Sequence, residues 1–316
     1  MFLNNNVKIG TSLSTAYTLG LRNIRIDVEC KTAYLLIGSS CERACDFCGM
    51  SKKEEKSLSR IKWPLFDLKE VVESLKLKVQ EKKIERVCLQ VTCSDNGALL
   101  KDLIYQIKEM NVPLSLSKSV ESLVEIEAYL ELGVDKVTVN LDLVQERDYL
   151  SYKGISYVEK KELLIAAAKK FSNKIVCHII IGFSESEQEC VELFNALINH
   201  RITVALFAFF PIKGTKLENH PQPEMGKYRR LQLVKYLLEQ KKMVFEKIKF
   251  DKFGKINSIS EVFDVMDRNL SKAFQTTGCQ GCTRPYYTER PSAPLYNFPY
   301  ALSCQEIEVC IKESGL

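Results

Sequence analysis

The chain has 316 residues, of which 46% are hydrophobic and 27% are charged, and its formal net charge is +5. This length suits one large α/β domain or two smaller ones, and the composition is typical of a globular protein in water. No apolar run is long enough to span a bilayer, and the first residues lack the basic-then-apolar order of a secretory signal. We therefore expect a cytoplasmic protein with no membrane partner.

The charged residues lie in mixed-sign helical runs such as KKEEK and EKKIER, which is typical of solvated helix faces. Nucleic-acid binding would need a concentrated basic stripe with interleaved aromatic residues, and the sequence has none. We expect no nucleic-acid partner.

Apolar runs and amphipathic stretches alternate along most of the chain. In order, the expected strands are TAYLLIG, RVCLQVT, VPLSLS, KVTVNLDL, KIVCHIIIGF and VALFAFFP, with FEKIKFDKF as a candidate seventh. The expected helices are LFDLKEVVESLKLKVQEK, LLKDLIYQIKEM, VESLVEIEAYLELG, YVEKKELLIAAAKKF, SEQECVELFNALINH, MGKYRRLQLVKYLLEQKKM and SISEVFDVMDRNLSKAF.

This order of β-then-α units predicts an α/β fold, a parallel (β/α) TIM-like barrel that is complete or nearly so. We expect an N-terminal extension over residues 1–30, the barrel over 31–275, and an irregular Cys/Pro/Tyr tail over 276–316 that ends in the short helix CQEIEVCIKE. In such barrels the chemistry takes place at the carboxyl ends of the strands.

The chain contains 12 cysteines. Disulfides are rare in cytoplasmic proteins, so closely spaced cysteines are interpreted as metal ligands. Cys41, Cys45 and Cys48 follow the first expected strand directly, in a C-x3-C-x2-C pattern. Three thiolates on one loop can hold three irons of a four-iron cluster and leave the fourth iron open to a small molecule. A zinc site, the alternative, would need a fourth ligand close by.

This motif, with Phe47 before its third cysteine, resembles the signature of the radical S-adenosylmethionine (SAM) superfamily, over roughly residues 30–256. The resemblance implies a [4Fe–4S] cluster whose open iron binds the amino and carboxylate groups of SAM. One electron then cleaves SAM to a 5′-deoxyadenosyl radical, which abstracts hydrogen from an unactivated carbon. The protein positions and shields these species.

Three later segments, NLD, IIIGFSE and FFPIKGT, are similar to strand ends of the same superfamily. Asn140 and Asp142 share one face of their strand, where they could hydrogen-bond a ribose or a substrate, and a simple strand-end cap is the alternative. The residues that the resemblance places around SAM are Phe47, Asn140, Asp142, Gly182, Glu185 and Thr215.

Biotin synthases, a branch with a similar overall pattern, hold a [2Fe–2S] cluster on three cysteines and an arginine. Cys88 matches the cysteine of the second strand, but Ser115, Val176 and Lys255 occupy the other three positions. We therefore expect no such cluster. The remaining isolated cysteines are interpreted as buried small apolar residues, namely Cys88, Cys93, Cys177 and Cys190.

The tail carries a second close pair, Cys279-x2-Cys282, in a segment rich in proline and tyrosine. We interpret this pair as part of a second, auxiliary [4Fe–4S] cluster, with Cys30 or Cys304 as a further ligand. A structural zinc site is the alternative.

The tail pattern GCxGCxRPYYxERPxxPxYN and the N-terminal GTSLSTAYTLGL resemble the two-protein, archaeal-type lipoyl synthases. In lipoyl synthases the auxiliary cluster is thought to supply sulfur, and a serine of an Arg-Ser-Ser-Tyr motif binds its labile iron. Here the segment reads Glu289-Arg290-Pro291-Ser292, which departs from that motif. Ser292 and Arg290 are the catalytic residues that the resemblance implies.

The resemblance implies sulfur insertion into an unactivated C–H bond of a protein-bound octanoyl chain. The partners would be an octanoylated carrier (H-protein, E2 lipoyl domain or a derived peptide), a sister radical SAM protein and an electron donor. The alternatives are radical carbon-skeleton rearrangement, biotin synthase-like chemistry on a small molecule, or a non-catalytic iron–sulfur scaffold that binds a partner through the tail.

Overall fold

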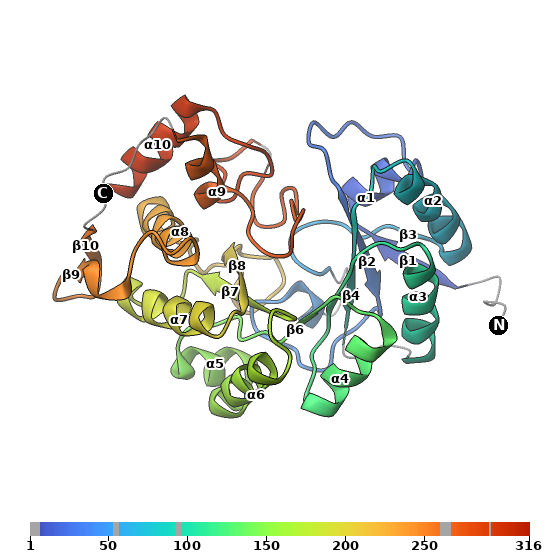
Figure 1. Cartoon of the computed structure of the whole chain (residues 1–316), viewed down its shortest axis with the longest axis horizontal. Helices are drawn as coiled ribbons and strands as arrows, with labels where there is room; N and C mark the ends of the chain where they lie inside the picture. The colour runs from blue at the N-terminus through green and yellow to red at the C-terminus, as the bar shows by residue number, and fades with distance from the viewer. Residues whose placement is uncertain (1–6, 53–56, 93–96, 260–266, 291) are drawn as a thin grey trace. The chain divides into compact units, whose positions relative to one another are not determined.

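The computed structural model describes residues 7–52, 57–92, 97–259, 267–290 and 292–316. The chain forms two compact units, which are described separately below (Figure 1). The first unit comprises Met1–Val139, Ile212–Glu218 and Cys279–Tyr287, and the second comprises Asn140–Pro211, Asn219–Gly278 and Thr288–Leu316. The tail expected over 276–316 is thus divided between the two units.

The first unit is built on a mixed sheet whose strands follow the order β3-β1-β2-β4-β5-β6. Strands β2, β4, β5 and β6 are parallel, whereas β1 pairs antiparallel with both β2 and β3. The strand bounds are β1 Lys8–Thr11, β2 Thr32–Ile37, β3 Leu65–Asp67, β4 Arg86–Val91, β5 Leu114–Ser117 and β6 Lys136–Thr138.

One row of this sheet positions the site described below. Tyr34 of β2 lies opposite Cys88 of β4, and Cys88 lies opposite Ser115 of β5. Side chains alternate between the two faces of a strand, so Thr32, Arg86 and these three residues share one face.

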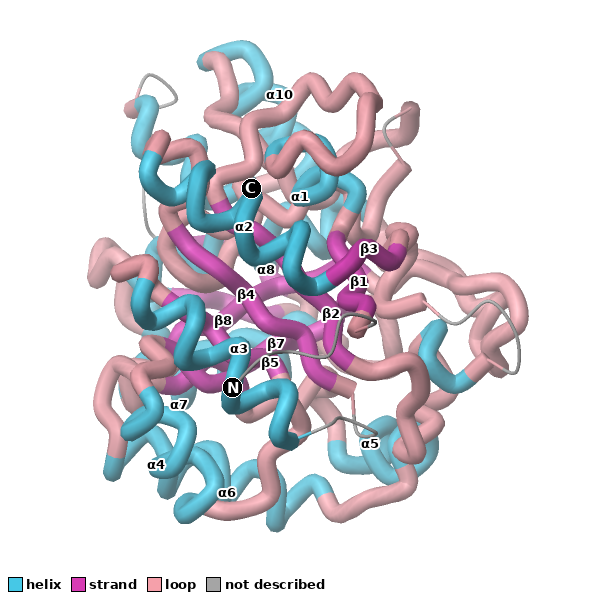
Figure 2. The backbone as a smooth tube through the Cα atoms, turned by 90° about the vertical axis from the view of Figure 1, so that its right-hand side faces the viewer, coloured by secondary structure: helices cyan, strands magenta, loops and turns pink. Residues whose placement is uncertain are grey.

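The helices of the first unit pack beside this sheet. Helix α2 contacts β1 and β3, α3 contacts β5, and α4 contacts β6. Figures 1 and 2 show α2 and α3 on the same side of the strands. The helix bounds are α1 Leu13–Thr18, η1 Gly49–Ser51, α2 Leu68–Gln80, α3 Gly97–Glu109 and α4 Leu123–Leu132.

The second unit contains the parallel pair β7–β8 and a separate antiparallel hairpin of β9 and β10. Ser186 begins α7 with a capping box, because its hydroxyl accepts the Glu189 N–H while the Glu189 carboxylate accepts the Ser186 N–H. The elements are α5 Glu146–Lys153, α6 Tyr157–Lys170, β7 Ile175–Ile181, α7 Glu187–Asn199, β8 Thr203–Ala208, α8 Met225–Glu239, η2 Phe245–Lys247, β9 Ile248–Phe250, β10 Ile256–Ile259, η3 Arg268–Leu270, α9 Ser271–Phe274 and α10 Cys304–Ser314.

Helix α8 is buried along most of its length and contacts α7, α9 and α10. Its buried charges are paired within the unit. Arg229 donates to Glu313, and Arg230 forms a 2.5 Å ion pair with Glu187 in which both side chains are 5% exposed. Glu187 also accepts the Ile256 N–H, so one carboxylate joins α7, α8 and β10.

The expected α/β fold with parallel strands is confirmed, and six of the expected strands form. The expected seventh β/α unit differs, because FEKIKFDKF forms β9 in the antiparallel hairpin rather than a parallel strand. Asp251 accepts the Phe253 and Lys255 N–H groups and thereby closes the hairpin turn. Part of its expected helix, residues 260–266, lies outside the described residues.

No helix within the described ranges combines the length and apolar composition needed to cross a membrane.

The Glu187–Arg230 pair gives a stability prediction. Replacing Arg230 with Met leaves the Glu187 carboxylate buried without its cation, which should cost about 3–5 kcal/mol of unfolding free energy. Chemical denaturation followed by circular dichroism measures this loss. The matched control is Lys312→Met, which removes an exposed pair with Glu308 and should leave stability nearly unchanged. Equal effects of the two substitutions would contradict the prediction.

Candidate metal centres

The loop that follows β2 carries Cys41, Cys45 and Cys48, all half-buried. Cys45 and Cys48 are joined by a turn, in which the Cys48 N–H donates to the Cys45 carbonyl at 3.0 Å. Ala44 has a φ of 46°, and Ser51 Oγ donates to the Cys48 carbonyl at 2.7 Å. The loop is therefore folded locally, with its thiols accessible in part.

Directly after the third cysteine, the backbone at Gly49 packs against the backbone at Ser57. A Cβ atom built on Gly49 would lie 2.4 Å from the Ser57 carbonyl oxygen, a distance that no real side chain tolerates. The absence of a side chain at this position therefore fixes the path by which the cysteine loop leaves the site.

The segment Ile212–Glu218 belongs to the same unit and contacts this loop. Lys216 pairs with Asp46 at 2.8 Å, and the Lys52 side chain lies against Gly214. The structure thus brings the segment of Thr215 to the cysteine loop. Thr215 itself is buried and donates to the Ile212 carbonyl, so its hydroxyl supports a turn. Phe47 is half-buried within the loop.

Asn140 and Asp142 lie in the second unit, just after β6. The Asn140 side-chain oxygen accepts the His178 N–H at 3.1 Å, and Asp142 pairs with Lys153 at 2.6 Å. Asp142 also exchanges backbone hydrogen bonds with β7 and has a φ of 65°. These contacts are those of a strand-end cap, one of the two interpretations that the sequence allowed. The other, a role in SAM binding, stays a prediction.

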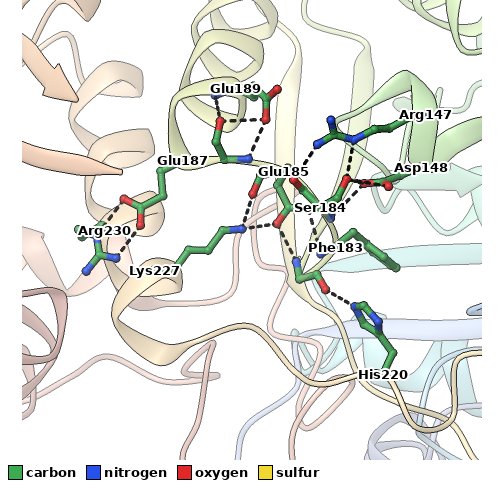
Figure 3. A network of polar contacts seen from close by, with 12 residues as sticks. Arg147, Asp148, Phe183, Ser184, Glu185, Glu187, Glu189, His220, Lys227 and Arg230 are labelled. Atoms are coloured by element: carbon green, nitrogen blue, oxygen red, sulfur yellow. Dashed lines mark hydrogen bonds and ion pairs between the residues drawn. The ribbon is translucent and has the colours of Figure 1, made fainter. Parts of the chain in front are cut away.

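Gly182 and Glu185 occupy the loop after β7, which ends at Ile181. Glu185 lies in a dense polar network (Figure 3). The Glu185 carboxylate, 4% exposed, accepts the N–H groups of Gly182 and Phe183 and pairs with Lys227. His220 Nε2 lies 2.7 Å from the Gly182 carbonyl, and its ring stacks on Phe183. Glu185 therefore fixes the backbone of this loop from within.

The tail pair lies against the face of β2 and β4 in the first unit. Thr32 Oγ1 donates to the Gly281 carbonyl at 2.9 Å, and Arg86 Nε donates to the Gln280 carbonyl at 3.1 Å. The Cys282 N–H donates to the Cys279 carbonyl at 3.0 Å, which closes a turn between the two cysteines. Two strand side chains thus hold the backbone between the two thiols.

The sulfur atoms of this pair contact hydroxyl groups of the same strand face. Ser115 Oγ donates to Cys279 Sγ at 3.2 Å, and the Tyr34 hydroxyl lies 3.3 Å from Cys282 Sγ. Burial raises the pKa of Cys279, opposed by the Ser115 hydrogen bond.

Cys30, one of the two predicted partners, lies close to Cys282. Cys30 is 3% exposed, and it packs with Tyr34 and Tyr287 in a core cluster against which Cys282 also packs. Its thiol donates to the Thr32 carbonyl at 3.2 Å and accepts from Thr283 at 3.6 Å. Burial raises the pKa of Cys30.

The other predicted tail residues belong to the second unit. Cys304 is the first residue of α10 and is half-buried. Arg290 and Ser292 are both exposed. Their roles in metal binding and catalysis stay predictions.

Cys88 is the residue that sequence reasoning set aside. It is only half-buried, unlike Cys177 and Cys190, which are fully buried. Cys88 and Cys282 pack against the same core cluster, and Ser115, which lies opposite Cys88, donates to Cys279. Burial raises the pKa of Cys88. The signal available in the sequence was strand alternation, which places Cys88 on the polar face with Arg86 and Gln90. Cys93 lies outside the described residues.

The chemistry of both sets of donors fits iron–sulfur clusters, because each offers several cysteine sulfurs, and the carboxylate of Asp46 in the first loop is paired with Lys216. Within the residues that the structure describes, no three His, Cys, Asp or Glu side chains converge on one ion. The thiolates of a cluster bind separate irons, so the ligands of a cluster need not converge on a single point.

Comparison with known proteins agrees with the first centre. Residues 35–197, just over half of the chain, match the family model described as the Radical SAM superfamily. An uncharacterised protein of Methanocaldococcus jannaschii, MJ0785, is 25% identical over 189 residues, which are 56% of this chain and 48% of that protein.

Among solved structures, the FeFe-hydrogenase maturase HydG from Carboxydothermus hydrogenoformans is similar with a TM-score of 0.51 and 13% identity, over 66% of this chain and 51% of that chain. A second structure of HydG, a maturase of the same hydrogenase class, gives a TM-score of 0.50 and 12% identity, over 71% and 57%. This chain thus spans about half the length of each of these proteins. At such low identity the likeness shows the fold.

Gly49 provides a test of the cysteine loop. In Gly49→Ala the new methyl group must displace the Ser57 backbone, so iron bound by Cys41, Cys45 and Cys48 should fall towards the content of a triple alanine variant. Iron content after anaerobic reconstitution measures this. The control is Gly97→Ala, where an added Cβ meets no atom within 4 Å. Full iron content in Gly49→Ala would show that this close packing is not needed.

Proposed function

Because this chain belongs to the radical SAM superfamily, we propose that it is a sulfur-inserting member, which acts on an unactivated C–H bond of a protein-bound octanoyl chain. The observation that carries this proposal is a second group of cysteines, since Cys279 and Cys282 lie in the same compact unit as the first cysteine loop. Their sulfurs contact Ser115 and Tyr34 on the strand face.

In this proposal Cys41, Cys45 and Cys48 hold the first cluster, and their partial exposure leaves room for SAM beside it. When bound, this cluster supplies the electron that cleaves SAM. Phe47 lies within the loop, and the segment of Thr215 contacts the loop. The Lys216–Asp46 pair, with an exposed lysine, joins that segment to the cysteines.

The loop after β7 is assigned to the adenosyl group of SAM. An added Cβ on Gly182 would lie 2.9 Å from Pro223 and 3.0 Å from Phe209, so only glycine permits this close backbone approach. Glu185 holds the loop by accepting two of its N–H groups and is a positioning residue. Asn140 and Asp142 are assigned to the ribose or the substrate, with their backbone contacts to β7 fixing their position.

The second cluster, on Cys279 and Cys282, would supply the sulfur atom. The tail pattern that resembles two-protein lipoyl synthases supports this assignment, as does the hydrogen bonding of both sulfurs. Arg290 and Ser292 are exposed on the same tail and are proposed to act at the labile iron of this cluster. We propose an octanoylated carrier protein as the substrate, with a sister radical SAM protein for the other insertion and a separate electron donor.

The first centre is tested by a Cys41→Ala/Cys45→Ala/Cys48→Ala variant. Removing all three thiolates leaves no ligand for the SAM-binding cluster, so formation of 5′-deoxyadenosine should fall to the level of the protein-free reaction. Chromatography of the products formed with SAM and a strong reductant measures it. Cys190→Ala, which removes a buried thiol of α7, is the control and should keep its activity. Product formation by the triple variant would contradict the assignment.

The second centre is tested by a Cys279→Ala/Cys282→Ala variant. This variant should still cleave SAM, because the first loop is intact, but it should form no thiolated product on an octanoylated peptide. Mass spectrometry of the peptide and measurement of 5′-deoxyadenosine separate the two steps. Thiolated product at the level of the unaltered protein would exclude a sulfur-supplying role. Turnover to a rearranged product instead would favour the carbon-skeleton alternative.

A further inference from the structure

We propose that Cys88 is the third protein ligand of the auxiliary cluster, beside Cys279 and Cys282, and that the face of β2, β4 and β5 supplies one hydrogen bond to each of the three sulfurs. This inference rests on the second cluster of the proposed function and names its ligands. It replaces Cys30 and Cys304, the partners that the sequence suggested, with a strand cysteine.

The position of Cys88 follows from the sheet. Cys88 is the third residue of β4, and its neighbours in the same row are Tyr34 of β2 and Ser115 of β5. Those two neighbours contact Cys282 and Cys279, respectively. The tail pair therefore lies over the row whose centre is Cys88. The cluster formed by Cys30, Tyr34, Ile61 and Tyr287 has both Cys88 and Cys282 packed against it.

Each of the three sulfurs accepts a hydrogen bond from a neutral strand side chain. Gln90 Nε2 donates to Cys88 Sγ at 2.9 Å, and Ser115 Oγ donates to Cys279 Sγ at 3.2 Å. The Tyr34 hydroxyl accepts the N–H groups of Thr283 and Arg284 at 3.1 and 3.0 Å. Its own proton is therefore directed to Cys282 Sγ, 3.3 Å away. Hydrogen bonds to the ligand sulfurs are a regular part of iron–sulfur sites.

Cys30 differs from these three sulfurs because its thiol also donates a hydrogen bond. Its thiol donates to the Thr32 carbonyl at 3.2 Å, a hydrogen bond that binding to iron would break. A metal ligand must give up that proton. Cys30 is therefore a structural thiol behind Tyr34, although it lies near Cys282. The contrast in hydrogen-bond direction separates two cysteines that sequence spacing alone cannot separate.

Tyr287 is a second, independent sign of a ligand at this place. Its hydroxyl is buried, its side chain is 6% exposed, and it has no hydrogen-bond partner within the described ranges. A buried hydroxyl without a hydrogen-bond partner is energetically costly, and the sulfide or thiolate atoms of a cluster would accept a hydrogen bond from it. The Tyr287 ring lies 5.5 Å from the Tyr34 ring and packs in the cluster that Cys88 and Cys282 border.

The charge of the surroundings suits an anionic cluster. Arg86 is 7% exposed, and its guanidinium contacts Ser115, Asp135 and the Gln280 carbonyl at 2.9–3.1 Å. Arg284, another cation of the same unit, is also buried. On assembly each of the three thiols releases one proton and forms one S–Fe bond, with no change of oxidation state at sulfur.

The test uses the Cys41/Cys45/Cys48 triple alanine variant as background, so that only the auxiliary cluster can bind iron. Into it are introduced Cys88→Ala, Cys30→Ala, Cys304→Ala and, as a matched control, Cys177→Ala, which alters the third residue of the buried strand β7. Iron, acid-labile sulfide and Mössbauer spectra are measured after anaerobic reconstitution, with circular dichroism as a check of folding. The background should hold about four irons.

We expect Cys88→Ala to lose most of this iron, whereas Cys30→Ala, Cys304→Ala and Cys177→Ala keep it. Gln90→Leu, which leaves all cysteines in place, should retain the cluster and shift its midpoint potential to more negative values, because one hydrogen bond to sulfur is lost. This second measurement keeps the proposal testable if Cys88→Ala does not fold.

Two outcomes would overturn the inference, and they differ in meaning. If the background binds no iron, there is no auxiliary cluster, and the proposed sulfur insertion fails together with its ligand set. If the background holds about four irons but Cys30→Ala or Cys304→Ala loses them while Cys88→Ala does not, the ligand assignment fails and the sulfur-insertion proposal stands.

Discussion

The hydrogen bonds from Thr32 and Arg86 to the carbonyls of Gly281 and Gln280 are the interactions on which the position of the tail cysteines in the first unit depends. They join strand residues to a tail segment that lies 249 and 194 positions further along the chain, respectively. Closing such a long loop costs only a little more entropy than closing a short one, because the cost grows with the logarithm of length. A few buried polar contacts and the packing of Tyr287 are therefore enough to hold Cys279 and Cys282 at the strand face.

Burial at this face has a chemical consequence. It is the largest cause of the raised pKa of Cys30, Cys88 and Cys279, so these thiols stay protonated at neutral pH when no cation is near. A nucleophilic cysteine needs the opposite environment, one that lowers its pKa. The charge of bound iron would outweigh the cost of burial and deprotonate the thiols that it contacts. The tail site is therefore suited to a metal cluster and unsuited to covalent catalysis by a free thiolate.

Sequence reasoning predicted what depends on local order and could not predict what depends on distant contacts. The spacing of Cys41, Cys45 and Cys48 and the apolar period of the strands are local, and the structure has both. The proximity of Cys88 to Cys279 and Cys282 is not local. The alternation of side chains along a strand predicts which face a residue lies on, but not which distant segment covers that face. The run FEKIKFDKF forms its strand, yet the turn closed by Asp251 makes that strand part of a hairpin. Short apolar runs do not reveal their pairing partners.

The hydrogen bonds at the strand face also bear on how a sulfide could be given up. In the proposed sulfur insertion a carbon radical and a sulfide lone pair would bring three electrons together. The C–S bond would hold two of them, and the third would pass to iron. If Cys88, Cys279 and Cys282 hold the cluster as proposed, that electron would add negative charge among their sulfurs. Hydrogen bonds to thiolates and sulfides stabilise the more negative form of such a cluster. Because Gln90, Ser115 and Tyr34 each direct one polar hydrogen at a different sulfur, they would favour the reduced state that C–S bond formation on the proposed cluster would produce.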